Sequence, residues 1–127
     1  MVIADSSVFI DLLRRNRTRQ VIRLEESVLG EVGIPDLVLY EVLDGVRPTS
    51  DLARVRARLL RFPVFATGGR DLALKAVENS HALRRLGIQV EIVDCLIATF
   101  CIEEGHSLLT SDTDFAPFAQ HLGLVLL

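Results

Sequence analysis

The sequence predicts an α/β protein in which helices cover both faces of a mainly parallel sheet. Short apolar segments of strand length alternate with segments of helical period along the whole chain, and this alternation is typical of parallel sheets. Half of the 127 residues are apolar, which is enough to build a core and argues against disorder. No repeat, low-complexity segment or linker interrupts the pattern, so residues 1–127 are expected to form one domain.

Five apolar segments are expected to form strands, and helices fill every interval between them. One or two helices separate each strand from the next. Connections of this length are typical of parallel crossovers and not of hairpins. The expected strands are Met1–Ala4, Val32–Ile34, Val64–Phe65, Ser107–Thr110 and Leu124–Leu127.

Glycine and proline delimit the expected helices, because glycine favours the turn that ends a helix and proline breaks its hydrogen bonding. Gly30, Gly87 and Gly105 each follow a helical segment. The expected helices are Ser7–Leu13, Val21–Leu29, Leu37–Asp44, a helix capped by Ser50-Asp51 and ended by Pro63, Asp71–Leu86, Asp94–Glu104 and a short helix after Phe115. The inward face of the fourth helix is expected to carry Leu52, Val55, Leu59 and Leu60, which are spaced as one face. The inward face of the fifth helix is expected to carry Leu72, Ala76, Val77, Ser80 and Leu83. The sixth is nearly all apolar and is expected to be buried.

Composition excludes several classes of protein. No apolar run reaches about 18 residues and no basic lead precedes the first apolar segment, so neither a membrane span nor a signal peptide is expected, and the default location is cytoplasmic. Cys95 and Cys101 lie six apart, which is not the spacing of a metal or redox pair, so both are expected to be buried, reduced thiols. The net charge is −3, yet 13 of the 14 basic residues are arginine, whose planar fork suits phosphate.

Carboxylates recur at corresponding places along the chain. Asp5 follows the first strand, Glu41 lies on the helix after the second, Asp94 begins the apolar helix, and Asp112 and Asp114 follow the fourth strand. The carboxyl ends of parallel strands meet at one edge, so these acids are expected to converge there and to repel one another unless a cation neutralises them. Oxygen ligands without histidine or cysteine favour Mg²⁺ or Mn²⁺.

Each acid also has a purely structural interpretation. Asp5 and Asp94 suit helix caps, Glu41 suits a solvated helix surface, and the two later aspartates suit a turn. If Asp5 binds a cation, Ser6 or Ser7 is the expected cap of the first helix. Ser7 and Thr110 are candidates for orienting the carboxylates, although strand-end hydroxyls also commonly satisfy backbone groups. The three histidines, His81, His106 and His121, are scattered and form no ligand pattern.

Four separated motifs resemble those of the PIN-domain ribonucleases. Asp5-Ser6-Ser7-Val8-Phe9-Ile10-Asp11 is similar to the opening motif of that family, and Leu109-Thr110-Ser111-Asp112-Thr113-Asp114-Phe115 is similar to its closing motif. Between them, Glu41-Val42-Leu43-Asp44-Gly45-Val46 and the segment from Gly87-Ile88 to Ala98 resemble the second and third acidic motifs. In size the chain most resembles the toxin subunits of VapBC toxin–antitoxin pairs.

The resemblance implies a PIN-like, three-layer α/β/α fold with a five-stranded parallel sheet. It also implies an endoribonuclease that depends on Mg²⁺ or Mn²⁺, with Asp5, Glu41, Asp94 and Asp112 as the acidic quartet and Asp114 as an added acid. The metal ligands implied are Asp5, Asp94, Asp112 and Asp114. The implied partners are an RNA substrate, a cognate antitoxin whose tail covers the active groove, and a second copy or an antitoxin hetero-oligomer.

Arginines are expected to form basic rims along which RNA approaches, because phosphate contacts position nucleic acid. The candidates are Arg14, Arg15, Arg17 and Arg19 after the first helix, and Arg54, Arg58 and Arg61 on the fourth. A solvated surface is the alternative for each of them. Tyr40 and six phenylalanines are the only aromatic side chains among Phe, Trp and Tyr, so RNA shape or a structured loop is the expected basis of specificity.

Other functions fit the residues less well. A phosphoacceptor receiver domain needs paired acids after the first strand, an aspartate after the middle strand and a late lysine, but Asp5 is followed by two serines and Lys75 is the only lysine. A haloacid-dehalogenase-like phosphatase needs D-x-D on the first strand, which is absent. Two alternatives remain open: a PIN-like nuclease of RNA processing outside a toxin–antitoxin pair, and a metal-binding, non-catalytic interaction module.

Overall fold

The computed structural model describes all residues, 1–127, and contains one five-stranded sheet in the order β3-β2-β1-β4-β5. Every pair of neighbouring strands is parallel, which confirms the predicted sheet. The strands are β1 Val2–Ala4, β2 Val32–Pro35, β3 Val64–Phe65, β4 Ser107–Leu109 and β5 Val125–Leu126.

Seven α-helices and one 3₁₀ turn connect the strands. The helices are α1 Ser6–Leu13, α2 Arg19–Glu26, α3 Asp36–Asp44, α4 Ser50–Leu59, α5 Arg70–Arg85, α6 Ile92–Glu104 and α7 Ala116–Leu122, with the 3₁₀ turn η1 at Thr113–Phe115. Each predicted helix is present, with small differences at the ends.

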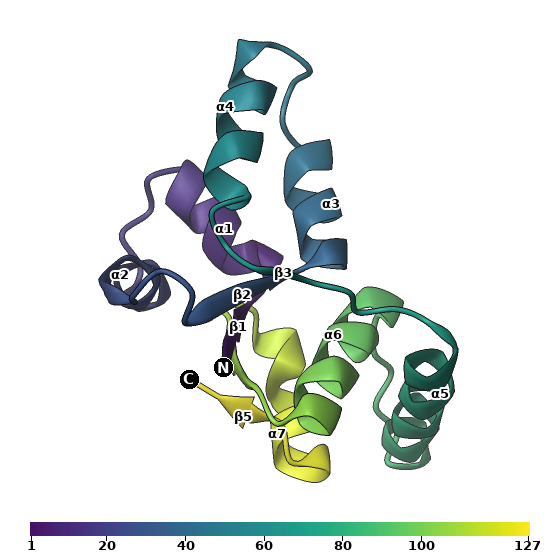
Figure 1. The fold of residues 1–127 in the computed structure, drawn as a ribbon. Helices are drawn as coiled ribbons and strands as arrows, with labels where there is room; N and C mark the ends of the chain where they lie inside the picture. Colours follow the sequence, from purple (N-terminus) through teal and green to yellow (C-terminus); the bar gives the residue numbers. More distant parts are fainter.

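The path of the chain through the sheet places a crevice between β1 and β4. The chain runs from β1 to β2 and β3 in one direction and then crosses back to β4 and β5. Because parallel crossovers are right-handed, the helices that connect strands in one direction cover one face of the sheet, and those that connect strands in the other direction cover the opposite face. Figure 1 shows α1 to α4 on one side of the sheet and α5 to α7 on the other. The order reverses at β1 and β4, and ligands of such sheets bind beyond the carboxyl ends of the strands at this reversal.

The core is apolar and α6 runs through it. Six of the 13 residues of α6 are buried, which confirms the buried helix expected from its composition. Cys95 and Cys101 are both buried free thiols, again as predicted. None of the helices combines the length and the apolar character needed to span a bilayer.

The predicted bounds of α2 are wrong at both ends. The helix begins two residues early because the side chain of Thr18 accepts a hydrogen bond from the backbone N–H of Val21 and caps it. It ends at Glu26, where the chain becomes extended. Val28 and Leu29 therefore lie outside the helix, 65% and 69% exposed.

The predicted inward faces of α4 and α5 are wrong at one residue each. Leu60 follows the last turn of α4 and is 46% exposed, whereas Leu59 is buried as expected. On α5, Ala76 and Leu83 are buried, but Val77 is 51% exposed. Val77 faces a cleft between α5 and α6 that the sequence pattern does not reveal.

Gly33 on β2 allows the ring of Phe65 on β3 to lie against the strand. A Cβ atom at position 33 would lie 2.3 Å from Phe65 Cε2 and 3.2 Å from Ile3 Cδ1. The ring is also held by Phe100 and His106, with ring centroids 5.8 and 5.7 Å away. The absence of a side chain at Gly33 is therefore a packing requirement.

Gly33→Ala should lower the free energy of unfolding by about 1–3 kcal/mol, because the Phe65 ring must leave its contacts to admit a methyl group. Urea unfolding followed by circular dichroism measures the change. Gly68→Ala is the matched control, since no atom lies within 4 Å of a Cβ there. Equal midpoints for the two variants would contradict this account of the β2–β3 contact.

Candidate metal centre

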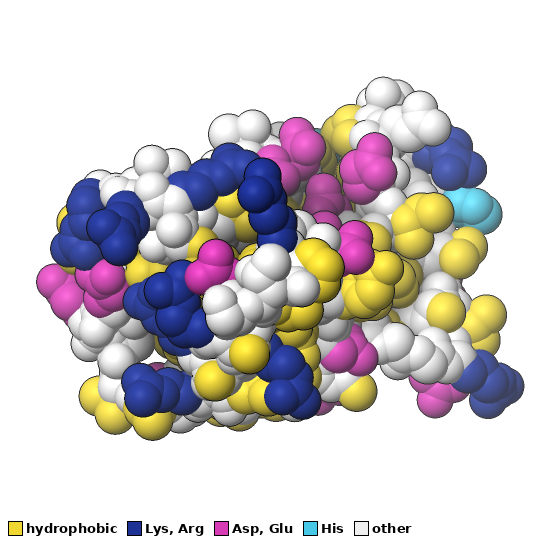
Figure 2. All heavy atoms as spheres, turned by 90° about the horizontal axis from the view of Figure 1, so that it is seen from above, with side chains coloured by type: hydrophobic (Ala, Val, Ile, Leu, Met, Phe, Trp, Pro, Cys, Tyr) yellow, Lys and Arg dark blue, Asp and Glu magenta, His cyan; other side chains and the backbone are white.

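The fold brings the predicted acids to the carboxyl edge of the sheet from four separate elements. Asp5 directly follows β1, Glu41 lies on α3, and Asp94 lies in the first turn of α6. Asp112 and Asp114 follow β4, the latter inside η1. In Figure 2, several acidic side chains surround a hollow on the face seen from above.

Three of these acids form a compact cluster. Carboxylate oxygens of Asp94, Asp112 and Asp114 lie within 4.8 Å of one another. The turn that carries the last two is fixed by Asp112, whose Oδ1 accepts a hydrogen bond of 2.8 Å from the backbone N–H of Asp114. Asp94 and Asp114 line a pocket of about 450 Å³ that is open to solvent. The pocket is lined by Gln89, Val90, Glu91, Asp94, Thr113, Asp114 and Pro117.

Asp5 lies beneath the cluster, only 3% exposed. Ser7 Oγ donates a 2.6 Å hydrogen bond to Asp5 Oδ1, and Thr110 Oγ1 donates one of 2.8 Å to Asp5 Oδ2. The same hydroxyls accept backbone N–H groups, Ser7 from Ser111 at 2.9 Å and Thr110 from Asp112 at 2.9 Å. These two hydroxyls therefore hydrogen-bond both the Asp5 carboxylate and the backbone, and their role beside a metal ligand stays a prediction.

The predicted helix caps are wrong. Asp5 occupies the N-cap position of α1 but makes no capping hydrogen bond through its side chain, and Ser6 and Ser7 are already inside the helix. Asp94 is not a cap either, because α6 begins at Ile92 and Glu91 holds the N-cap position. The carboxylates of Asp5 and Asp94 are thus not used to cap their helices.

Glu41 lies at the margin of the cluster. Its side chain is exposed and its oxygens are not among those within 4.8 Å of one another. Partial burial raises its pKa above the usual value. Its charge also contributes to raising the pKa of Asp94, so Glu41 and Asp94 face the same space.

Burial, and to a smaller extent repulsion between carboxylates, raises the pKa values of Asp5 and Asp94. Burial raises the pKa of Asp5 to about 6, an effect that the Ser7 and Thr110 hydroxyls oppose and the charge of Asp112 increases. Burial also raises the pKa of Asp94 to about 6, and the next largest cause is again Asp112. Further contributions to Asp94 come from Asp5, Asp114 and Glu41. A cation placed among these groups would remove the repulsion that raises their pKa values.

The donor set fits a hard divalent cation. All the clustered donors are carboxylate oxygens, and the three histidines lie elsewhere, on α5, at the start of β4 and on α7. Oxygen donors without nitrogen or sulfur favour Mg²⁺ or Mn²⁺ over zinc.

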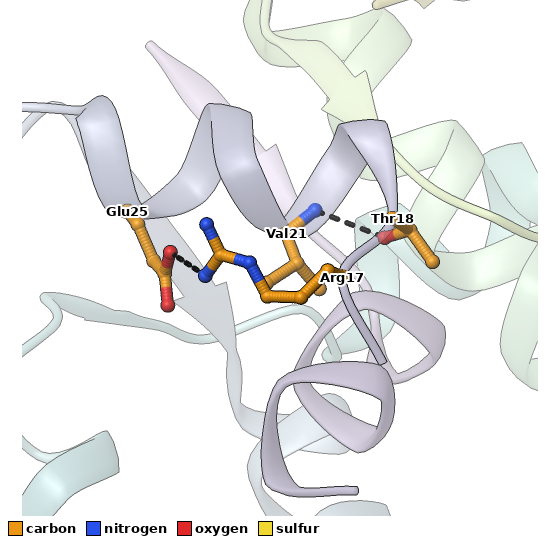
Figure 3. Close-up of polar contacts among 4 residues, drawn as sticks. All are labelled: Arg17, Thr18, Val21 and Glu25. Atoms are coloured by element: carbon orange, nitrogen blue, oxygen red, sulfur yellow. Dashed lines mark hydrogen bonds and ion pairs between the residues drawn. The ribbon is translucent and has the colours of Figure 1, made fainter. Parts of the chain in front are cut away.

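The arginines predicted to bind RNA near the first helix are all exposed, but two are engaged within the protein. Arg17, which precedes α2, forms an ion pair with Glu25 in the last turn of that helix, as Figure 3 shows. Arg19 donates to the backbone carbonyl of Leu127 at 3.4 Å. Arg14 and Arg15 have no acidic partner, which leaves them the stronger candidates of the four for phosphate contacts.

The arginines predicted to bind RNA on α4 and just after it are also only partly free of contacts within the protein. Arg54 pairs with Asp51 at 2.9 Å. Arg58 and Arg61 line an apolar groove between α4 and α2 instead of an edge of the acidic pocket. Three of the predicted arginines nevertheless lie together, because Arg15, Arg17 and Arg58 line one pocket, which shares no residue with the acidic pocket.

Comparison with known families and structures identifies the fold. A model of the PIN domain matches residues 2–120. The chain belongs to the PIN-domain family. A comparison with curated proteins gave no match.

Several of the similar solved structures are toxin–antitoxin proteins. A DNA-bound VapBC complex from Salmonella typhimurium has a TM-score of 0.78 at 18% identity, covering 99% of this chain and 96% of that one. A toxin–antitoxin complex from Klebsiella pneumoniae has a TM-score of 0.76 at 20% identity, covering 98% and 96%. The VapC20 toxin of Mycobacterium tuberculosis, which cleaves the sarcin–ricin loop, has a TM-score of 0.72 at 21% identity, covering 98% and 97%. At such identities the likeness establishes the shared fold.

Several residues of the PIN-domain pocket were not singled out from the sequence as site residues. Gln89, Val90 and Pro117 line it, although none carries an ionisable group. Thr113 also lines it and stands between two candidate acids, which is the one sequence signal that would have found it. Glu91 is visible in the sequence as an extra acid before Asp94.

The free energy of unfolding without metal should fall as the pH rises from about 4 to above 6. Burial raises the pKa of Asp94 from its usual value of 3.8 to about 6 in the fold. The folded protein therefore binds more protons than the unfolded chain across this range. In a chelator at pH 7.5, Asp94→Asn should raise the free energy of unfolding by about 1 kcal/mol, a value reduced for solvent screening of a half-buried group. At pH 4 the difference should vanish.

Urea unfolding at several pH values tests this, with Asp71→Asn as the control because Asp71 is fully exposed on α5. A wild type whose stability does not change between pH 4 and 7, or an Asp94→Asn variant less stable than wild type at pH 7.5, would contradict the predicted repulsion.

Proposed function

We propose that this PIN-domain protein is a Mg²⁺- or Mn²⁺-dependent endoribonuclease and the toxin of a type II toxin–antitoxin pair. The observation that carries the proposal is the cluster of Asp94, Asp112 and Asp114 beside the buried Asp5. These groups lie at the switch point of the sheet, where ligands bind in folds of this class. The likeness to VapC-type toxins supports the toxin role.

The chain's own residues provide a binding and orienting site. Asp94, Asp112 and Asp114, with Asp5 beneath them, would hold the ion. A divalent ion supplies an activated water near neutral pH and offsets charge that develops on the phosphorus centre. Hydrolysis of this kind breaks the phosphodiester bond, and the family resemblance implies products with a 5′-phosphate and a 3′-hydroxyl.

Glu41 would hold or orient the attacking water, or help to bind a second ion. It lies at the margin of the cluster on a different helix from Asp94, and partial burial raises its pKa, which makes its carboxylate a better proton acceptor than an ordinary glutamate. Both roles use the same carboxylate. Thr110 and Ser7 would keep Asp5 in one orientation, as partners of metal ligands commonly do.

Asp94→Asn and Asp112→Asn should each lower RNA cleavage by about a hundredfold or more, because each removes a charged oxygen donor from the cluster. Cleavage of total RNA with Mg²⁺ or Mn²⁺ is followed on denaturing gels, and circular dichroism checks the fold. EDTA should abolish cleavage by the wild type.

Glu104→Gln serves as the matched control, because Glu104 is an exposed acid at the opposite end of α6. It should retain full activity. Undiminished cleavage by both aspartate variants would refute the assignment of the active site.

An antitoxin is proposed as the protein partner, as a small subunit that blocks the nuclease and forms a hetero-oligomer with it. The similar complexes from Salmonella and Klebsiella are toxin–antitoxin assemblies. An apolar groove formed by α1, α2 and α4 suits a protein partner: it includes the exposed Val28 and Leu29 and is flanked by Arg58 and Arg61. Exposed apolar surface of this kind commonly marks a protein interface.

Expression of the wild type should arrest bacterial growth, whereas Asp94→Asn should not, because the toxic effect depends on RNA cleavage. Co-expression of the small protein encoded by a neighbouring gene should restore growth. Colony counts after induction measure both effects. Normal growth while active wild-type enzyme accumulates would contradict the toxin role but leave the nuclease intact.

The same experiments separate the two alternatives. A nuclease of RNA processing would cleave RNA in vitro without arresting growth. A non-catalytic interaction module would bind the metal, measured by calorimetry, and leave RNA uncut.

A further inference from the structure

A second cleft adjoins the acidic pocket. It has a volume of about 440 Å³ and lies between α5 and the start of α6, which pack side by side (Figure 1). Seven of its ten lining residues are hydrophobic. The lining residues are Ala73, Ala76, Val77, Ser80, Arg84, Gln89, Val90, Ile92, Cys95 and Leu96.

The cleft and the acidic pocket share a wall. Gln89 and Val90 line both cavities. The first turn of α6 separates them, with Asp94 on the acidic side and Ile92 and Cys95 on the apolar side. A molecule bound at the acidic cluster therefore reaches the apolar cleft across a single helical turn.

The walls of the cleft leave apolar surface open to solvent. Val77 is 51% exposed and Ile92 is 77% exposed. The small side chains of Ala73 and Ser80 on α5 stand one turn to either side of Val77 and keep the space open. The Cys95 thiol donates to the carbonyl of Ala76 at 3.3 Å, so it closes the floor and joins the two helices.

Polar groups stand among these apolar walls. The amide of Gln89, the hydroxyl of Ser80 and the guanidinium of Arg84 line the cleft, and none has a protein side-chain partner. Apolar walls with a few hydrogen-bonding groups are the usual composition of a small-ligand site, and the volume lies in the usual range. Arginine and glutamine both match the hydrogen-bonding edges of nucleobases.

We propose that this cleft takes an unpaired base of the RNA whose phosphate lies at the acidic cluster. The proposal rests on the proposed nuclease function and specifies its substrate: RNA with an unstacked base next to the cleaved bond. Sequence-specific recognition of RNA commonly uses such splayed bases, packed on side chains and hydrogen-bonded along their edges. The base packs against Val77 and Ile92, and Gln89 and Arg84 read its edge.

The test uses binding of labelled RNA without cleavage. Fluorescence anisotropy measures the affinity of A₈, C₈, G₈ and U₈ oligonucleotides and of an RNA duplex in Ca²⁺, and gels check that the RNA stays intact. Val77→Trp fills the cleft from an exposed position. Leu74→Trp is the matched control, since Leu74 is 59% exposed on the same helix but does not line the cleft.

The wild type should prefer one homopolymer, and Val77→Trp should weaken that preferred binding about tenfold or more while leaving duplex binding unchanged. Leu74→Trp should behave as wild type, and Gln89→Ala should reduce the preference among bases. In Mg²⁺, Val77→Trp should raise KM for a single-stranded substrate more than it lowers kcat.

The same ranking and affinities in wild type and Val77→Trp would overturn the proposal. So would a change from dimer to monomer in Val77→Trp with unaltered RNA affinity, because the cleft would then be covered by a second copy of the chain. If wild type cleaves RNA and Val77→Trp cleaves it equally well, the cleft assignment fails and the nuclease stands. If the base preference depends on Val77 but Mg²⁺ yields no cleavage, the nuclease assignment fails and the cleft stands.

Discussion

The buried carboxylate of Asp5 is the group that holds the acidic edge of the sheet together. One of its oxygens accepts from Ser7 on α1 and the other from Thr110 after β4. The two hydroxyls in turn receive the backbone N–H groups of Ser111 and Asp112. The loop that carries the later aspartates is therefore fixed to the end of β1 through two hydroxyl groups, and loss of either hydroxyl would remove one hydrogen bond from the carboxylate and one from the loop.

This arrangement concentrates negative charge where the protein can least solvate it. The pKa values of Asp5 and Asp94 rise to about 6, chiefly because these groups are buried and further because Asp112 lies near both. Without a metal, these carboxylates thus oppose the stability of the fold, as is common where like charges gather at candidate functional sites. A bound divalent cation reverses the sign of this effect, which couples metal binding to folding.

The cleft that adjoins the acidic pocket is lined mainly by hydrophobic residues, whereas the pocket itself is lined mainly by polar and charged ones. Binding and hydrolysis of a phosphodiester require charged groups, whereas discrimination between bases requires apolar walls and a few hydrogen-bonding groups. The first turn of α6 serves both, since Asp94 lines one cavity and Ile92 the other.

The sequence by itself determined the parallel sheet, the order of the helices and the acids at the sheet edge. Strand and helix periods are local properties, and the ends of parallel strands necessarily meet at one edge. Only the tertiary structure decided that Asp94, Asp112 and Asp114 form the tight cluster while Asp5 lies buried and Glu41 stays at its margin. It also paired Arg17 with Glu25 and exposed Val77. These outcomes depend on distances between elements far apart in the chain, which side-chain packing sets and no local pattern encodes.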